Sequence, residues 1–116
     1  MAFDELEAKR VEKAMSAFMA KRRPPQAIRH ELDLQYRVAG QSVEIFEIRP
    51  VWRGAPGEVT EQPVAKTTYV RTQRLWRVFW MRADLRWHAY PPAPTVATFD
   101  AFLLHVDRDE HACFFG

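Results

Sequence analysis

Cysteine and glycine are both scarce in this sequence. Cys113 is the single cysteine, which excludes an internal disulfide and a thiolate metal centre built from one chain, and fits a reducing compartment. There are four glycines among 116 residues, and no Gly-x-Gly-x-x-Gly or P-loop pattern contains them. A phosphate-cradling loop is therefore not expected, and the sequence predicts no cofactor.

Long apolar runs and a strong charge of one sign are also missing. No stretch stays apolar for the length of a membrane span, and the N-terminus alternates acids and bases where a signal peptide has an apolar region. We therefore expect a cytoplasmic protein without membrane contact. The net charge of +2 points to no partner, but between residues 64 and 88 six bases accompany a single acid.

The two ends of the chain are predicted to be helical, within a single domain of residues 1–116. Asp4 and Glu7 have the spacing of a capping box, and apolar residues then recur at helical spacing as far as Arg22, before Pro24 stops the helix. Thr98 is expected to cap a second helix of about three turns. The apolar residues of that helix would be Phe99, Phe102, Leu103 and Val106. The tail that follows ends in two phenylalanines, which we expect to dock on the domain.

Between these helices the pattern changes to that of strands. Residues 32–38 alternate, and a hairpin closed at Ala39-Gly40 would place Tyr36 opposite Val43. A β-bulge near Phe46 would turn Phe46 and Ile48 inwards. Residues 52–62 are expected to form an exposed loop, followed by a strand over 64–70 that pairs with the next. The order of elements predicts an α+β domain, a five-stranded antiparallel meander sheet with an N-terminal and a C-terminal helix packed on it.

Residues 74–90 contain three of the four tryptophans and are predicted to form the central hairpin. A two-residue turn at Ala83-Asp84 would place Trp80 opposite Trp87. One face would then be core, formed by Trp76, Val78, Trp80, Leu85, Trp87 and Ala89. The other face would carry Arg77, Phe79, Met81, Arg86, His88 and Tyr90.

Several segments resemble a family of small bacterial proteins catalogued as a domain of unknown function, DUF3024. These segments are FDEL at 3–6, KRRPP at 21–25, QSVEIFEIRP at 41–50, PVAK at 63–66, Trp76, Trp80, RADL at 82–85, WH at 87–88 and DEHACFFG at 109–116. The resemblance covers nearly the whole chain and implies a bacterial, single-domain protein. It implies no activity, cofactor or catalytic residue.

The second face of the central hairpin predicts a binding surface. Its candidate residues are Lys66, Arg77, Phe79, Arg86, His88 and Tyr90. Cations alternating with rings are typical of proteins that bind single-stranded nucleic acid, because cations contact phosphates and rings stack on bases. The first hypothesis is therefore a non-catalytic protein that binds a polyanion. Two alternatives stay open: a helix covers this face, or the aromatic sheet is a homodimer or protein–protein interface.

An enzyme would need titratable groups that converge, and the best set is Glu44, Glu47, Arg49, Asp84 and His88, of which the last four would form the site. Spacing alone does not bring these residues together, so catalysis is the weakest of the three hypotheses. His111 and Cys113 are the best candidate metal ligands, but two ligands make no zinc site, and no metal is predicted.

Overall fold

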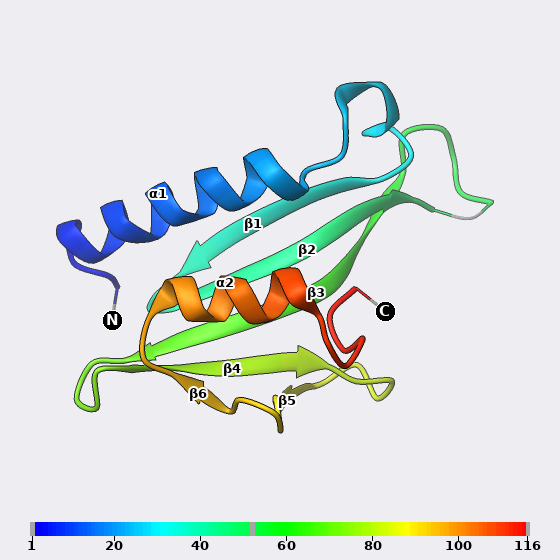
Figure 1. Ribbon diagram of the computed structural model, residues 1–116. Coiled ribbons are helices and arrows are strands. Elements are labelled where there is room, and N and C mark those ends of the chain that lie inside the picture. Colours follow the sequence, from blue (N-terminus) through cyan, green and yellow to red (C-terminus); the bar gives the residue numbers. More distant parts are fainter. Residues whose placement is uncertain (1, 52, 116) are drawn as a thin grey trace.

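The computed structural model describes residues 2–51 and 53–115, which form an α+β fold (Figure 1). In chain order the elements are α1 (Glu5–Arg22), the 3-10 turn η1 (Gln26–Ile28), β1 (Asp33–Ala39), β2 (Ser42–Pro50), β3 (Val59–Val70), β4 (Leu75–Met81), β5 (Trp87–Ala89), β6 (Thr95–Val96) and α2 (Phe99–Arg108). Strands β1 to β5 lie in chain order and are antiparallel, which confirms the predicted meander and its two terminal helices. The short strand β6, which the sequence did not predict, pairs with Trp76 and Arg77 of β4.

Both predicted helix starts are confirmed. At α1 the Asp4 carboxylate accepts a hydrogen bond from the Glu7 backbone N–H at 2.7 Å, and the Glu7 carboxylate accepts one from the Asp4 N–H at 2.9 Å. At α2 the Thr98 hydroxyl accepts a hydrogen bond from the Ala101 N–H at 3.1 Å. These bonds satisfy backbone donors that the first turn of a helix otherwise leaves without partners.

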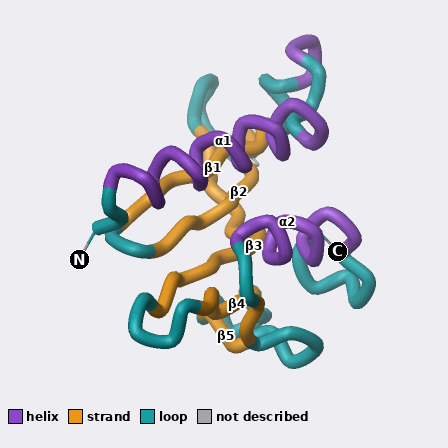
Figure 2. Tube along the Cα trace, turned by 60° about the vertical axis from the view of Figure 1, so that its left-hand side comes forward, coloured by secondary structure: helices purple, strands orange, loops and turns teal. Residues whose placement is uncertain are grey.

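Both helices pack on the same face of the sheet, which we call the covered face (Figures 1 and 2). The core lies between the two layers. It is formed by Val11, Met15 and Phe18 of α1, Val43, Ile45, Ala65 and Val78 of the sheet, Phe99, Phe102, Leu103 and Val106 of α2, and Phe114 of the tail. Each large side chain buried there stabilises the fold by about 1.5–3 kcal/mol. The predicted apolar stripe of α2 and the docked tail are thus confirmed.

In the first two hairpins the residues lie on the faces of the sheet that the sequence predicted. In β1–β2 the turn is Gly40-Gln41, so Tyr36 pairs with Ile45 and not with Val43 as expected. This is a shift of two residues, and two residues are one full period of a strand, so every side chain keeps its predicted face. In β3–β4 the predicted pairing of Tyr69 with Trp76 is confirmed.

The β4–β5 hairpin has a different register from the predicted one. The Leu85 N–H donates to the Arg82 carbonyl at 2.9 Å, the Arg82 N–H donates to the Arg86 carbonyl at 3.2 Å, and Leu85 has a φ of 62°. A type I turn followed by a left-handed residue closes a three-residue loop. The loop is one residue longer than expected, so Trp87 pairs with Met81 and not with Trp80. A shift of one residue inverts the faces of β5 and of the chain that follows it.

The bulge between β2 and β3 also differs from the prediction. Ile45 pairs with Ala65 and Phe46 pairs with Pro63, so the extra residue is Val64 on β3, and β2 continues to alternate. Phe46 therefore does not turn inwards. It lies on the opposite face of the sheet, where its ring centroid is 4.1 Å from the central carbon of the Arg37 guanidinium. The predicted loop over 52–62 is shorter than expected, because β3 already begins at Val59; Trp52 lies outside the described residues.

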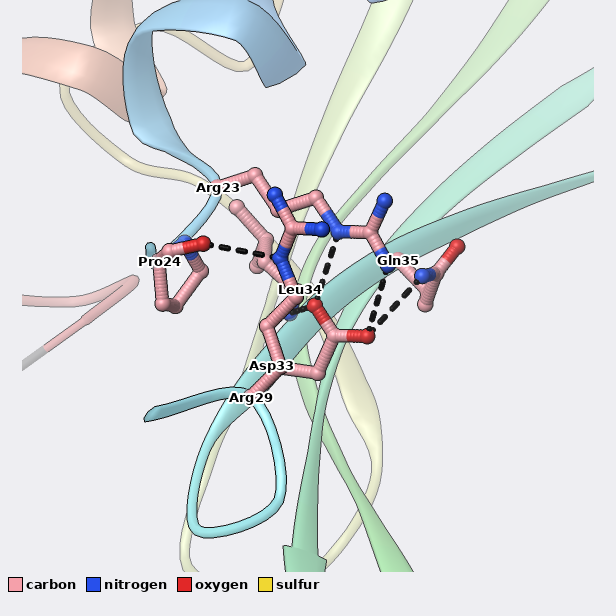
Figure 3. Close-up of polar contacts among 6 residues, drawn as sticks. All are labelled: Arg23, Pro24, Arg29, Asp33, Leu34 and Gln35. Atoms are coloured by element: carbon pink, nitrogen blue, oxygen red, sulfur yellow. Dashed lines mark hydrogen bonds and ion pairs between the residues drawn. The ribbon is translucent and has the colours of Figure 1, made fainter. Parts of the chain in front are cut away.

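The basic run at the end of α1 contacts carboxylates of neighbouring elements. Lys21 and Arg22 lie 2.6 and 3.7 Å from Asp107 of α2. Arg23 binds both oxygens of Asp33 on β1, at 2.9 and 3.0 Å (Figure 3). The end of α1 is thereby held to α2 and to the edge of the sheet. Among the described residues, no helix has both the length and the apolar composition to span a bilayer.

Candidate functional site

The sheet face away from α1 and α2, which we call the open face, is the candidate site. Alternation places every second residue of each strand on it. From β1 to β5 these residues include Gln35, Arg37, Glu44, Phe46, Lys66, Thr68, Arg77, Phe79, Met81 and Trp87. In the part of the chain that the structure describes, both helices pack against the other face, so neither helix covers the open face (Figure 2), although Phe46 is only 6% exposed there.

In the β1–β2 half of the open face, the cation has acidic partners. The Arg37 guanidinium donates a hydrogen bond to Glu61 and lies 3.6 Å from Glu44. The hydrogen bond to Glu61 raises the pKa of Arg37. The same guanidinium covers the ring of Phe46. Charge and aromatic surface are therefore both engaged within this half.

The β3–β5 half has rings and cations that form no ion pair among the described residues, although Glu44 of β2 lies opposite Lys66. We call Lys66, Arg77, Phe79 and Trp87 the basic aromatic patch. The Lys66 ammonium lies 6.0 Å from the ring centroids of both Phe79 and Trp87. Arg77 is exposed on the neighbouring strand. Within residues 2–51 and 53–115, no carboxylate lies within 4 Å of Lys66 or Arg77. Such a surface offers two cations and two half-buried rings to a ligand.

The structure brings together some of the predicted binding residues but not all of them. Lys66, Arg77 and Phe79 share the open face, as expected. Arg86 lies in the exposed β4–β5 loop. The placement of His88 and Tyr90 beside Phe79 was wrong, because the one-residue register shift moves both to the covered side.

Tyr90 is part of the core, with 1% of its surface exposed. Its ring packs 4.8 Å from that of Phe114, and its burial raises the pKa of its phenol. Trp87, predicted to be core, lies on the open face opposite Met81 and supplies the second ring there, which was expected to be Tyr90. Leu85, predicted to be core, is 80% exposed in the loop.

The residues of the enzyme hypothesis form two separate pairs. Glu47 and Arg49 lie 3.3 Å apart on β2, while the Asp84 carboxylate lies 2.8 Å from His88 Nε2. Strands β3 and β4 lie between β2 and β5, which separates the pairs by roughly 14 Å at about 4.8 Å per strand. The four side chains therefore do not form one catalytic centre.

Asp84 has a local role in the β4–β5 loop. Its carboxylate accepts a hydrogen bond from the Arg86 N–H at 3.0 Å in addition to the contact with His88. The hydrogen bond with His88, followed by the one from Arg86, lowers the pKa of Asp84. An aspartate bound to the backbone of its own turn is a common loop-closing device.

The C-terminal cysteine and histidine do not assemble a metal site. Cys113 is half-buried, and its Sγ lies 3.6 Å from the His111 carbonyl oxygen. Burial raises the pKa of the Cys113 thiol, which lowers its nucleophilicity. Across the described residues, no three His, Cys, Asp or Glu side chains lie close enough to hold a metal ion.

Residues 3–116 match the model of a family described as Domain of unknown function (DUF3024). No curated protein and no solved structure matches the chain.

Proposed function

The chain belongs to the DUF3024 family, a domain of unknown function, and from this premise we propose that it is a non-catalytic protein that binds a polyanion, namely single-stranded nucleic acid, through the basic aromatic patch. The setting that we propose is the cytoplasm of a bacterium. The single cysteine and the resemblance to a bacterial family support this setting.

One observation carries the proposal: the Lys66 ammonium lies 6.0 Å from the centroids of two rings on a sheet face that α1 and α2 leave uncovered. Proteins that bind single strands combine cations that follow the phosphates with aromatic side chains on which bases stack. Phe79 and Trp87 supply the rings. Lys66 and Arg77 supply the charges, and Arg86 extends them into the β4–β5 loop. Stacking tolerates any base, so the proposed binding is independent of sequence.

The test is fluorescence anisotropy of a labelled oligothymidine of about 15 nucleotides at several salt concentrations. If Lys66, Arg77 and Arg86 neutralise three phosphates, log affinity should fall with log salt at a slope of roughly −2, given about 0.7 per contact on single strands. The double variant Lys66→Gln/Arg77→Gln should flatten that slope by about one to one and a half. As a control, Arg108→Gln removes one positive charge from α2, away from the patch, and should leave the slope unchanged.

Stacking is tested separately from charge. Trp87→Ala should weaken binding by about 1–3 kcal/mol with little change in slope, because it removes a ring and no cation. Tyr90→Phe is the control, since this side chain lies in the core. No binding at concentrations below about 100 μM at low salt would end the proposal.

A homodimer interface is the second candidate for the same surface. Met81 pairs with Trp87 beside Phe79, and aromatic side chains, methionine and arginine are enriched at protein interfaces. A symmetric dimer would bury these side chains against a second copy. Light scattering at micromolar concentrations decides: a monomer mass removes the dimer and leaves nucleic-acid binding to its own test.

A further inference from the structure

A pocket of about 690 Å³ lies on the covered side of the sheet, away from the basic aromatic patch. It is lined by α1 between Glu7 and Ala17, by residues around the β3–β4 turn and by the start of α2, all of which lie toward the left side of Figure 1. Ligand pockets for small molecules have volumes of roughly 300–1,000 Å³. The space therefore suits a small molecule.

The inner wall of this pocket is aromatic. The ring centroid of Trp76 lies 4.8 Å from that of Tyr69 and 5.1 Å from that of Phe99, and all three residues line the pocket. Opposite them, α1 contributes the small side chains of Ala14 and Ala17, which leave room beside the rings. Trp76 and Phe99 are each 7% exposed, so the half-buried Tyr69 offers more ring surface than either, and a flat apolar body would pack against it with the offset or tilted geometry that aromatic rings prefer.

The rim of the pocket has an excess of available positive charge. Arg10 and Lys13 lie one turn apart on α1, and Arg74 lies in the β3–β4 turn. No carboxylate of the described residues lies within 4 Å of these three cations.

The rim also has two acids, Glu7 and Asp100. The Glu7 carboxylate already accepts a hydrogen bond from Arg71 at 2.6 Å, and this bond lowers the pKa of Glu7. Asp100 lies in the first turn of α2, where the helix dipole stabilises a negative charge. The three rim cations therefore outnumber the acids, and an anionic group on a ligand would complement them.

We propose that this pocket binds a small aromatic anion, a planar ring system that carries a carboxylate or a phosphate. The ring packs against Tyr69, Trp76 and Phe99. The anionic group contacts the rim cations, where arginine forks match both carboxylate and phosphate. This site is independent of nucleic-acid binding, which uses the opposite face.

Isothermal titration calorimetry of the full chain tests the site with three probes that share one ring system: 2-naphthoate, 2-naphthyl phosphate and the neutral 2-naphthamide. We expect one or both anions to bind about tenfold more tightly than the amide. The stronger of the two anions identifies the natural head group. If neither anion binds at concentrations up to about 1 mM, or if the amide binds as tightly as the anions, the proposal is overturned.

A pair of variants on α1 locates the binding. Ala17→Phe puts a ring into the pocket from an exposed helix position and should reduce the affinity for the anion at least tenfold. Ala20→Phe makes the same change at an exposed position that does not line the pocket, and should leave the affinity unchanged. Unchanged affinity in a folded Ala17→Phe would contradict the assignment.

A charge variant keeps the test decisive if Ala17→Phe does not fold. The double variant Arg10→Gln/Lys13→Gln changes exposed side chains and should reduce anion binding about tenfold while the amide binds as before. Equal anion affinity in this variant would refute the role of the rim. Oligothymidine anisotropy should not change in Ala17→Phe, so failure here and failure of the nucleic-acid proposal are distinguishable.

Discussion

The two faces of the sheet are made by alternate residues of the same strands, yet their side chains have opposite tasks. On the covered face Val43, Ile45 and Ala65 have no exposed surface and hold the two layers together. On the open face Lys66 and Phe79, from the neighbouring strands β3 and β4, meet as a cation and a ring that neither helix covers. The contacts between the sheet and the helices therefore lie on one face, and neither helix covers the other face.

The two halves of the open face differ in their ion pairs, and among the described residues those of the basic aromatic patch form none. Arg37 in the β1–β2 half contacts Glu44 and Glu61 and covers Phe46. Lys66 in the β3–β5 half lies 6.0 Å from the centroids of two rings and, among the described residues, has no carboxylate within 4 Å, because Glu44 opposite it on β2 pairs with Arg37. Both halves have cations near rings, but in one of them the charge is compensated. A polyanion would thus be attracted to the β3–β5 half.

The two faces can be compared by replacing one tryptophan on each. The largest change in the free energy of unfolding is expected from this pair of variants. Trp76 lies on the covered face, 7% exposed and in contact with the rings of Phe3, Tyr69 and Phe99. Trp76→Ala should lower the free energy of unfolding by about 3–5 kcal/mol. Trp87→Ala, on the open face, should lower it by about 1 kcal/mol. Urea denaturation measures both, and equal losses would show that the open face is also needed for folding.

The Arg23–Asp33 ion pair joins the end of α1 to the edge of the sheet. Its loss should lower the free energy of unfolding by less than Trp76→Ala does. Asp33→Asn should destabilise the protein by about 1–2 kcal/mol near neutral pH, because the carboxylate accepts hydrogen bonds from Arg23, Gln35 and the Leu34 backbone (Figure 3). Glu12→Gln, an exposed change on α1, is the matched control and should be nearly neutral.

The same ion pair predicts a pH dependence. The Arg23 guanidinium, with Gln35 and the Leu34 N–H, holds the pKa of Asp33 well below its usual range. The unfolded carboxyl takes up its proton near pH 4, which is at higher pH than in the folded protein. The stabilisation is therefore complete above that pH and is lost as the pH falls below it. Thermal melts from pH 6 to about pH 3 should show a smaller loss of stability in Asp33→Asn than in the wild type; parallel curves would contradict this linkage.

The helix caps and the hairpin registers differ in how well the sequence predicts them. The capping box at Asp4 and the Thr98 cap are local signals, and both were predicted correctly. The β1–β2 register was wrong by two residues, which left its faces intact, whereas one residue in the β4–β5 loop moved Tyr90 into the core. The left-handed position of that loop is occupied by Leu85 and not by a glycine, so the sequence has no signal for the three-residue loop.

The pocket also lay beyond sequence reasoning, for a different reason. Lys13, Arg74 and Trp76 come from separate elements, and their meeting depends on how α1 and α2 lie on the sheet. Periodicity assigns a residue to a face of its own element, but it does not fix the position of one element on another. Arg10 and Lys13 thus read as solvated positions of an amphipathic helix until the packing is known.

The smallest predicted effect concerns the residue that sets the β4–β5 register. Leu85 has a φ of 62° and is 80% exposed, so Leu85→Gly removes backbone strain and almost no packing. The left-handed conformation costs a leucine about 1–2 kcal/mol, and the greater freedom of glycine in the unfolded chain offsets part of the gain. Leu85→Gly should therefore stabilise the protein by less than about 1 kcal/mol. Ala83→Gly, in the same loop but without a positive φ, should destabilise it by about 0.5–1 kcal/mol. Thermal melts that ranked the two variants in the opposite order would show that a left-handed Leu85 does not set the register, and with it the placement of Trp87 on the open face.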